Sequence, residues 1–378
     1  GDRVMKFSFS HLMPWPYFPN AGEDWPVSNK SFIPDKATDV YEDYISAIGF
    51  ADECGFDWVS CNEHHMSPYG LMPNPNLLGA ILTQRTKKAR ILMSGNIVPL
   101  LNPIRVAEEY AMLDCISGGR LIAGFMRGIP HEYVAYNVPP NDSWGRLMEA
   151  CALIKKAWTA PEPFGWEGEY YQFRAVSIWP KPRQKPHPRI ILSASSPQSA
   201  RFAAEQGAMA GIVRVTDLDT VAGAIKIYRE HAHECGWDPA PDDIMVGMYC
   251  NIADTEAEAK QNLDLGLSYF VNVLGGGIRT AQRLVVQKTR YYQDEENKDH
   301  ITKRAATHAK VTIEDRVKNG IVLCGTPDQV IEQVKTIHKK WGHGVTSVNM
   351  KVGKIPEPAV RRSLELFRDY VKPALADL

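Results

Sequence analysis

Apolar, strand-like runs alternate with amphipathic helical stretches along almost all of this chain of 378 residues. Eight runs have the length and composition of strands: Met5–Phe9, Asp57–Ser60, Arg90–Gly95, Arg120–Gly124, Arg189–Ala194, Ala210–Val215, Asp243–Ile252 and Thr346–Lys351. Helical patterns fall between and after them, at 38–54, 75–86, 103–116, 144–158, 197–206, 218–235, 255–270, 327–340 and 357–371. Eight strand–helix units in series predict an α/β fold, a closed parallel (β/α)8 or TIM barrel. An open doubly wound sheet is the alternative, although it would usually have fewer strands.

Three stretches break the alternation and predict insertions after strands 1, 4 and 7 of the barrel. Residues 11–35 are rich in Pro, Trp and Asn and predict a long loop over the barrel mouth, and residues 161–188 predict a hairpin. Residues 275–320 begin with three glycines and are dense in charge. They fit either a mobile lid over the active-site end or a solvated excursion at an oligomer contact. We expect residues 1–378 to form one domain around this barrel.

Charge and cysteine content exclude several classes of protein. The formal net charge is −1 and no basic cluster is interleaved with aromatic residues, so neither nucleic-acid binding nor attraction to an acidic membrane is expected. The seven cysteines are dispersed without CxxC spacing, which predicts reduced thiols and a cytoplasmic protein. No signal peptide and no apolar run of about 18 residues is found, so membrane spanning is not expected.

The run Glu-His-His at 63–65 lies just past the carboxyl end of the second predicted strand. In α/β barrels this is the end at which ligands bind. Histidine can move protons or hydrogen-bond a developing anion near neutral pH, so an imidazole here is a candidate catalytic group. The alternative is a structural histidine pair. No zinc site is expected, because the spacing is not HExxH and the His/Cys group at 231–235 falls on a helix that is already amphipathic.

Ordered features spread over nearly the whole chain resemble the bacterial luciferase-like flavin monooxygenase family. In sequence order they are Gly55–Asp57, Glu63–His65, Asn74-Pro75, Ser94–Asn96, Pro103–Arg105, Leu113-Asp114, Ser117–Arg120, Arg127-Gly128, Arg146 with Glu149, Ala194–Pro197 with Ser199, and Gly325–Pro327. None is specific alone, but their order and spacing around one barrel are. The resemblance implies a (β/α)8 barrel that binds a flavin at its carboxyl end.

The resemblance also implies an activity and its partners. Such an enzyme uses reduced FMN and dioxygen to oxygenate a small, apolar or aromatic organic substrate through a flavin hydroperoxide. No Gly-rich dinucleotide fingerprint follows any predicted strand, so we expect a separate NAD(P)H-dependent flavin reductase to supply reduced FMN. Family members commonly dimerise through helices beside the early strands, which predicts a homodimer. The alternatives are a deazaflavin-dependent dehydrogenase or reductase on the same barrel, and a flavin-storing subunit without catalysis.

The resemblance assigns roles to particular residues. His64 is the catalytic histidine, whereas His65 is expected to be structural, with Glu63 orienting the pair. The cofactor-binding set comprises small residues under the flavin ring, a polar group at its edge, and cations and a helix mouth for the phosphate: Ser94, Gly95, Asn96, Arg127, Gly128, Arg146, Ala194, Ser195, Ser196 and Ser199. Ser94-Gly95 matches a place where family members often have a non-proline cis peptide. Helix amides and arginines suit a phosphate because both present fixed donors to an anion.

The remaining expectations concern the substrate. Its cavity wall is expected to include Trp15, Tyr17, Tyr69, Tyr133 and Arg214. Aromatic rings over a barrel mouth suit an apolar or aromatic substrate, but each could instead pack the loop onto the barrel. Arg214 could pair with an anionic substrate or with a nearby aspartate. Met126 stands where the light-emitting luciferases have a reactive cysteine, so luminescence gains no support. Ser195 stands where those luciferases have a glutamate, so the ribityl and phosphate contacts at this position follow less directly from the resemblance.

Overall fold

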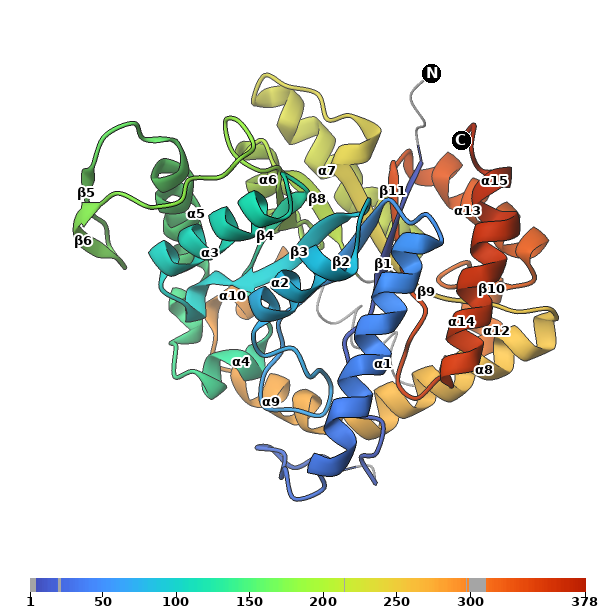
Figure 1. The fold of residues 1–378 in the computed structure, drawn as a ribbon. Coiled ribbons are helices and arrows are strands. Elements are labelled where there is room, and N and C mark those ends of the chain that lie inside the picture. The colour runs from blue at the N-terminus through green and yellow to red at the C-terminus, as the bar shows by residue number, and fades with distance from the viewer. Residues whose placement is uncertain (1–4, 20–21, 214, 297, 299–310) are drawn as a thin grey trace.

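Eight parallel strands close into a barrel in the computed structural model, which describes residues 5–19, 22–213, 215–296, 298 and 311–378 (Figure 1). Around the barrel they are β1 (Lys6–Ser10), β2 (Trp58–Cys61), β3 (Arg90–Ile97), β4 (Leu121–Met126), β7 (Ile190–Ser193), β8 (Met209–Ile212), β9 (Ile244–Ile252) and β11 (Val345–Asn349). Pairing of β8 with β9 and of β11 with β1 closes the ring. The predicted (β/α)8 barrel is confirmed.

Helices surround the barrel (Figure 1). They are α1 (Pro34–Glu53), α2 (Pro75–Arg85), α3 (Pro103–Ile116), α4 (Pro130–Ala135), α5 (Ser143–Thr159), α6 (Pro197–Glu205), α7 (Leu218–Glu234), α8 (Glu256–Ser268), α9 (Gly276–Val286), α10 (Arg290–Gln293), α12 (Ile313–Lys318), α13 (Pro327–Trp341), α14 (Glu357–Leu366) and α15 (Lys372–Ala374). Several begin with proline after a polar cap. The side chains of Asn74 and Asn102, for example, accept hydrogen bonds from the first-turn amides of α2 and α3.

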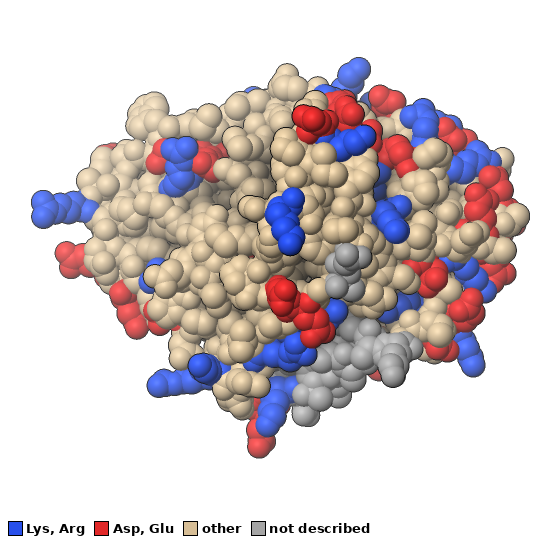
Figure 2. All heavy atoms as spheres, turned by 90° about the horizontal axis from the view of Figure 1, so that it is seen from below, with Lys and Arg blue, Asp and Glu red and all other residues tan. Residues whose placement is uncertain are grey.

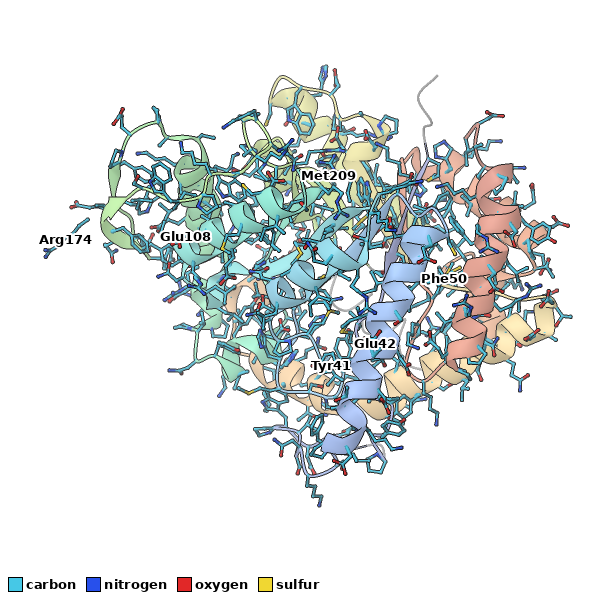
Figure 3. The ribbon with its side chains drawn as sticks, in the orientation of Figure 1. Tyr41, Glu42, Phe50, Glu108, Arg174 and Met209 are labelled. Atoms are coloured by element: carbon cyan, nitrogen blue, oxygen red, sulfur yellow. The ribbon has the colours of Figure 1, made fainter. Side chains whose placement is uncertain are left out.

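All three predicted insertions are present. Residues 161–188 contain the antiparallel hairpin of β5 (Phe164–Glu167) and β6 (Gln172–Val176), which projects from the barrel with Arg174 pointing outward (Figure 3). Residues 275–320 contain α9, α10 and α12, and α9 packs beside α4 at the carboxyl ends of the strands. The sequence missed β10 (Leu323–Gly325), which pairs with the end of β9. Three residues are too short to show a strand period.

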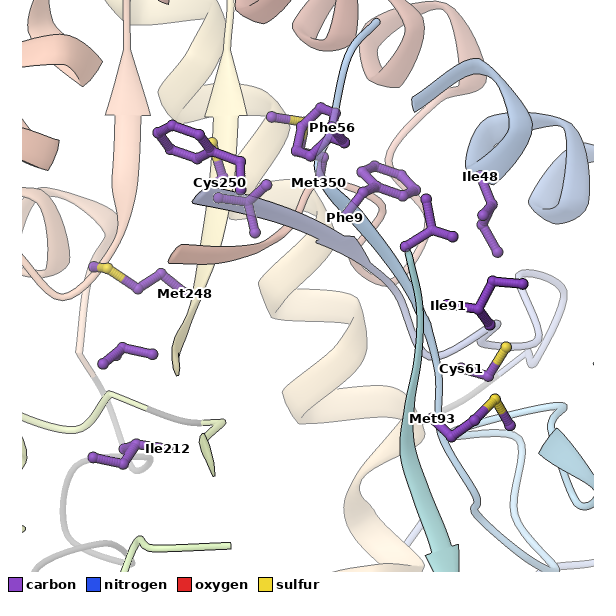
Figure 4. Close-up of a cluster of buried hydrophobic side chains, with 14 of the residues drawn as sticks. Phe9, Ile48, Phe56, Cys61, Ile91, Met93, Ile212, Met248, Cys250 and Met350 are labelled. Carbon is purple, nitrogen blue, oxygen red and sulfur yellow. The ribbon is translucent and has the colours of Figure 1, made fainter. Parts of the chain in front are cut away.

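The barrel interior is filled at one end. One side chain from each of seven strands forms a buried cluster: Trp58, Leu92, Ile122, Ile191, Met209, Met245 and Val345. On either side of Leu92 in β3, Ile91 and Met93 belong to a second, larger buried cluster. This cluster also contains Ile48 of α1 (Figure 4). Such alternation is how a barrel fills its centre and packs its helices at once. This packing leaves space for a ligand towards the carboxyl ends of the strands.

Figure 2 shows the face at those carboxyl ends, where acidic and basic side chains are interspersed and neutral side chains predominate near the centre. No patch of a single sign dominates it. Within the described residues, no helix combines the length and the apolar character needed to cross a bilayer.

Candidate active site

A cavity of about 340 Å³ lies between the carboxyl ends of the strands and the insertion that follows β9. Its wall includes His64 and Asn62 after β2, Ser94 in β3, and Met248 in β9. The facing wall comes from the residues before and within α9. This volume is at the lower end of the range for small-molecule sites, about 300–1,000 Å³.

His64 is held in one orientation by a buried carboxylate. Its Nδ1 lies 2.9 Å from Oε1 of Glu132, a fully buried residue of α4. The other carboxylate oxygen of Glu132 accepts a hydrogen bond of 2.8 Å from the backbone N–H of Ile129. With Nδ1 donating to Glu132, Nε2 is the nitrogen left to accept or hold a proton in the cavity. The sequence did not single out Glu132, because its contact with His64 spans 68 residues.

His65 belongs to the core. Its Nε2 lies 2.6 Å from Oε1 of Glu63, and the side chain is 3% exposed. The second oxygen of Glu63 accepts a hydrogen bond of 2.7 Å from the backbone of Ile97. Glu63 was expected to orient both histidines, but its side chain contacts His65 and not His64. His64 pairs with Glu132 instead.

The residues expected under the flavin ring divide into two groups. Ser94 lines the cavity, and its peptide bond to Gly95 is cis. A Cβ on Gly95 would lie 2.4 Å from the carbonyl oxygen of Gly124, so no side chain fits at this position. Asn96 does not reach the cavity. Its side-chain amide exchanges two hydrogen bonds with Asn76, of 2.8 and 2.9 Å, and the residue is 2% exposed.

The two expected phosphate arginines each have a buried donor without a partner. Arg127 follows β4, and its Nη1 makes no hydrogen bond within the described part of the chain. The same holds for Nε of Arg146 on α5. Burying an N–H of a cation without an acceptor is unfavourable, so such groups indicate a site that an anion completes. Gly128 has a φ of 95°, and a Cβ there would lie 2.8 Å from Ile97.

The mouth of α6 supplies further donors beside Arg127. Ser196 caps the helix by accepting a hydrogen bond of 3.2 Å from the N–H of Ser199, and the two hydroxyls lie 2.9 Å apart. The first-turn amides and the positive end of the helix dipole favour an anion. Ala194 and Ser195 precede this cap, with Ala194 fully buried. In this conformation Arg127 and Arg146 do not line the cavity around His64. The serines at the start of α6 do not line it either.

Of the expected substrate residues that the structure describes, only Tyr69 lines the cavity. Trp15, Tyr17 and Tyr133 do not line this cavity. Trp15 is buried against Tyr17 and Phe32 within the loop after β1, and Tyr17 is 46% exposed. Tyr133 is fully buried, and its hydroxyl donates to the carbonyls of Arg127 and Gly128. Arg214 lies outside the described residues.

Several cavity residues were not singled out from the sequence, although some belong to the loop at 11–35 and the insertion at 275–320 that it discussed at the barrel mouth. They are His11, Tyr249, Phe270, Arg279, Gln282 and Arg316. The signal for Arg279 and Gln282 was the density of charged and polar residues in the insertion, which does not single out either residue. Across the described chain, no group of three His, Cys, Asp or Glu side chains could hold a metal ion.

The sequence matches the luciferase-like monooxygenase family over residues 25–343. The chain belongs to this family. The oxygenase component of a flavin-dependent trigonelline monooxygenase from Acinetobacter baylyi is 29% identical over 344 residues, 89% of this chain and 91% of that protein. This luciferase-like protein is thus a flavin-dependent monooxygenase.

Solved structures with this luciferase-like fold cover nearly the whole chain. The monooxygenase RslO1 from Streptomyces bottropensis has a TM-score of 0.74 at 26% identity, covering 98% of this chain and 99% of that one. The oxygenating constituent of 3,6-diketocamphane monooxygenase from Pseudomonas putida, in complex with FMN, has a TM-score of 0.73 at 22% identity and covers 98% of both chains. An F420-dependent secondary alcohol dehydrogenase shares the fold at 18% identity and a TM-score of 0.68, covering 98% of this chain and 99% of that one.

Proposed function

We propose that the protein is a monooxygenase that binds reduced FMN at the carboxyl end of its barrel. The observation that carries this proposal is the pair of buried, unpartnered guanidinium N–H groups on Arg127 and Arg146. A phosphate carrying nearly two negative charges would satisfy both, together with the first turn of α6. Ser94 and Gly95 would hold the ring beside His64, since no Cβ fits at Gly95. These residues fit FMN.

The chemistry divides between cofactor and protein. The chemistry that reduced FMN would supply when bound is the transfer of two electrons to dioxygen, by which one oxygen atom would enter the substrate and the other would leave as water. His64 holds or moves a proton at Nε2, and Glu132 keeps its Nδ1 protonated. The apolar part of the cavity wall, which includes Phe270 and Val271, excludes water from the reaction.

The proposal also covers the substrate, the partner and the location. Tyr69, Tyr249 and Phe270 line the cavity and suit a small apolar or aromatic substrate. The relative from Acinetobacter baylyi is the oxygenase component of its enzyme, which supports supply of reduced FMN by a separate NAD(P)H-dependent reductase. A reductase that uses NAD(P)H fits the cytoplasmic location that the dispersed cysteines predict.

A homodimer is the third part of the proposal. Exposed apolar side chains gather on three neighbouring helices, α2, α3 and α5. They are Leu77 (67% exposed), Ile81 (43%), Met112 (49%), Ile116 (53%) and Met148 (41%). Exposed apolar side chains on neighbouring helices support a protein contact, and a second copy matches the dimers of the family.

A deazaflavin-dependent dehydrogenase is the second candidate, supported by the F420-dependent enzyme that shares the fold. Titration with FMN and with F420, a deazaflavin, separates the two.

The decisive assay supplies FMN, a flavin reductase, NADH and ¹⁸O₂, and detects products of a panel of small aromatic compounds by mass spectrometry. We expect one ¹⁸O atom in the product and loss of this product in His64→Ala. Binding of F420 but not FMN, or products without ¹⁸O, would contradict the monooxygenase.

A further inference from the structure

The insertion side of the cavity is cationic. Arg279 and Gln282 lie one turn apart on α9, and both line the cavity. The buried Arg316 of α12 also lines it. Nη1 of Arg279 donates to the backbone carbonyl of Val271 at 2.5 Å. This neutral acceptor leaves the charge of Arg279 uncompensated by any carboxylate within the described residues.

The rest of the wall does not balance this charge. Among the described residues that line the cavity, none is Asp or Glu. His11 adds no charge, because burial and then Lys351 lower its pKa to about 3. A guanidinium facing a partly enclosed site is stabilised when an anion enters, and its planar fork matches a carboxylate better than a spherical ion.

Aromatic rings and the catalytic imidazole line the same cavity, in Tyr69, Phe270 and His64. We propose that the substrate is a small aromatic acid whose carboxylate is bound by Arg279, with Gln282 as a second donor. This inference rests on the proposed function, because it names the class of substrate for that site. The ring would then lie among aromatic side chains beside His64.

The test compares ring-matched acids and amides. Binding of benzoate against benzamide, and nicotinate against nicotinamide, is measured by calorimetry on the complex with oxidised FMN. We expect each acid to bind about tenfold or more tightly than its amide, and Arg279→Gln to remove this preference while amide binding stays unchanged. Arg283→Gln is the matched control, because Arg283 lies on the same helix, 62% exposed, and pairs with Glu23 at 3.3 Å.

Equal binding of acids and amides, no binding of either, or a preference that survives Arg279→Gln would overturn the inference. Weaker FMN binding in Arg279→Gln without a change for the acids would assign Arg279 to the flavin instead, and would also overturn it. Acid-selective binding without ¹⁸O incorporation would leave the anion site standing and refute the monooxygenase. The two failures are therefore distinguishable.

A second and independent observation concerns the phosphate cluster. The ring centroid of Tyr291, on α10, lies 3.7 Å from Cζ of Arg127, and its hydroxyl lies 3.0 Å from Oγ of Ser196. Tyr292 accepts a hydrogen bond of 3.4 Å from Nη2 of Arg127. Side chains of the insertion thus contact two of the groups that we assign to the cofactor phosphate, Arg127 and Ser196.

Further contacts hold this segment in place. The backbone N–H of Arg290 donates to Oδ1 of Asn141 at 2.9 Å. Beyond α10, Glu296 forms an ion pair of 3.2 Å with Arg201 on α6. We infer that α10 is a self-blocking latch, in which Tyr291 competes with the FMN phosphate for Arg127 and Ser196. Phosphate entry then requires α10 to move, and this couples cofactor binding to the position of the insertion.

Riboflavin lacks the phosphate and so isolates the competition. FMN and riboflavin affinities are measured by flavin fluorescence for wild type, Tyr291→Ala and Tyr291→Phe. We expect Tyr291→Ala to bind FMN about tenfold more tightly with riboflavin affinity unchanged, and Tyr291→Phe to fall between, because it keeps the cation–π contact and loses the hydroxyl. Tyr370→Ala, at a tyrosine that is 58% exposed, is the control. Unchanged FMN binding in Tyr291→Ala would overturn the latch. Weaker FMN binding would also overturn it, and would indicate that Tyr291 is a ligand of the phosphate.

Discussion

At the scale of single residues, we propose that proton handling depends on the pair formed by His64 and Glu132. Glu132→Gln keeps the size of the side chain but replaces a charged acceptor with an amide that can also donate to Nδ1 and reverse the tautomer. We expect kcat to fall about 10- to 100-fold with FMN affinity unchanged, and more dioxygen to be released as hydrogen peroxide. Steady-state rates measure kcat, and a peroxide assay measures the hydrogen peroxide that is released.

The control for this prediction is a double variant compared with His64→Ala alone. His64→Ala combined with Glu132→Gln should be no slower than His64→Ala alone, because Glu132 acts through the imidazole. Additive losses would show that Glu132 works independently of His64. Gln at 132 could also destabilise the protein, so equal melting temperatures are required before the rates are compared.

His64 could be selected from the sequence, but its surroundings could not. A run of charged and imidazole groups after a strand is visible in a window of a few residues. Glu132 and Asn76 act through contacts that close only when the barrel forms, across 68 and 20 residues. Asn96 was expected at the ring edge because nothing local reveals that Asn76 takes both ends of its amide. Long-range pairing of this kind leaves no periodic signal.

At the scale of elements, Glu149 on α5 organises the hairpin that projects from the barrel. Its carboxylate accepts hydrogen bonds from the indole of Trp166 at 2.9 Å and from the backbone of Tyr170 and Tyr171 at 2.8 and 3.1 Å. Glu149→Ala leaves these donors without an acceptor. We expect a loss of about 2–3 kcal/mol in unfolding free energy and faster hydrogen exchange over residues 164–176.

Exchange followed by mass spectrometry checks this prediction, with Glu162→Ala as the control because Glu162 is exposed in the same segment. Uniform exchange changes over the whole chain would indicate general destabilisation instead of a local role. The hairpin itself was predicted for residues 161–188. β10 was not, because three residues in a sheet carry too little pattern, and its pairing depends on the end of β9.

At the scale of the whole molecule, three buried histidines make stability depend on pH. Burial is the largest cause that lowers the pKa of His11 and His343 to about 3 and that of His131 to about 4. These groups stay neutral in the folded state but bind protons in the unfolded state below about pH 6.5. Stability is therefore complete above pH 6.5 and is lost as the pH falls, by up to about 4 kcal/mol per unit for three groups.

Urea unfolding at pH 7, 6 and 5 measures this slope. His343→Asn should reduce the slope between pH 6 and 5 by about a third, whatever its effect on stability at pH 7. His233→Gln, at a side chain that is 78% exposed, should leave it unchanged. An equal slope in His343→Asn and wild type would show that His343 does not titrate on unfolding.

The apolar face on α2, α3 and α5 determines the assembly that we expect. Ile116 is 53% exposed and Met112, one turn earlier on α3, is 49% exposed. A charge placed there stays solvated in a monomer but is desolvated in a dimer, so Ile116→Glu with Met112→Glu should disrupt association and leave the fold intact. In analytical ultracentrifugation we expect wild type at twice the chain mass of 42.3 kDa and the double variant at the chain mass. Tyr370→Glu, at another exposed apolar position, should remain dimeric. A wild-type monomer, or a double variant that still dimerises, would place the contact elsewhere.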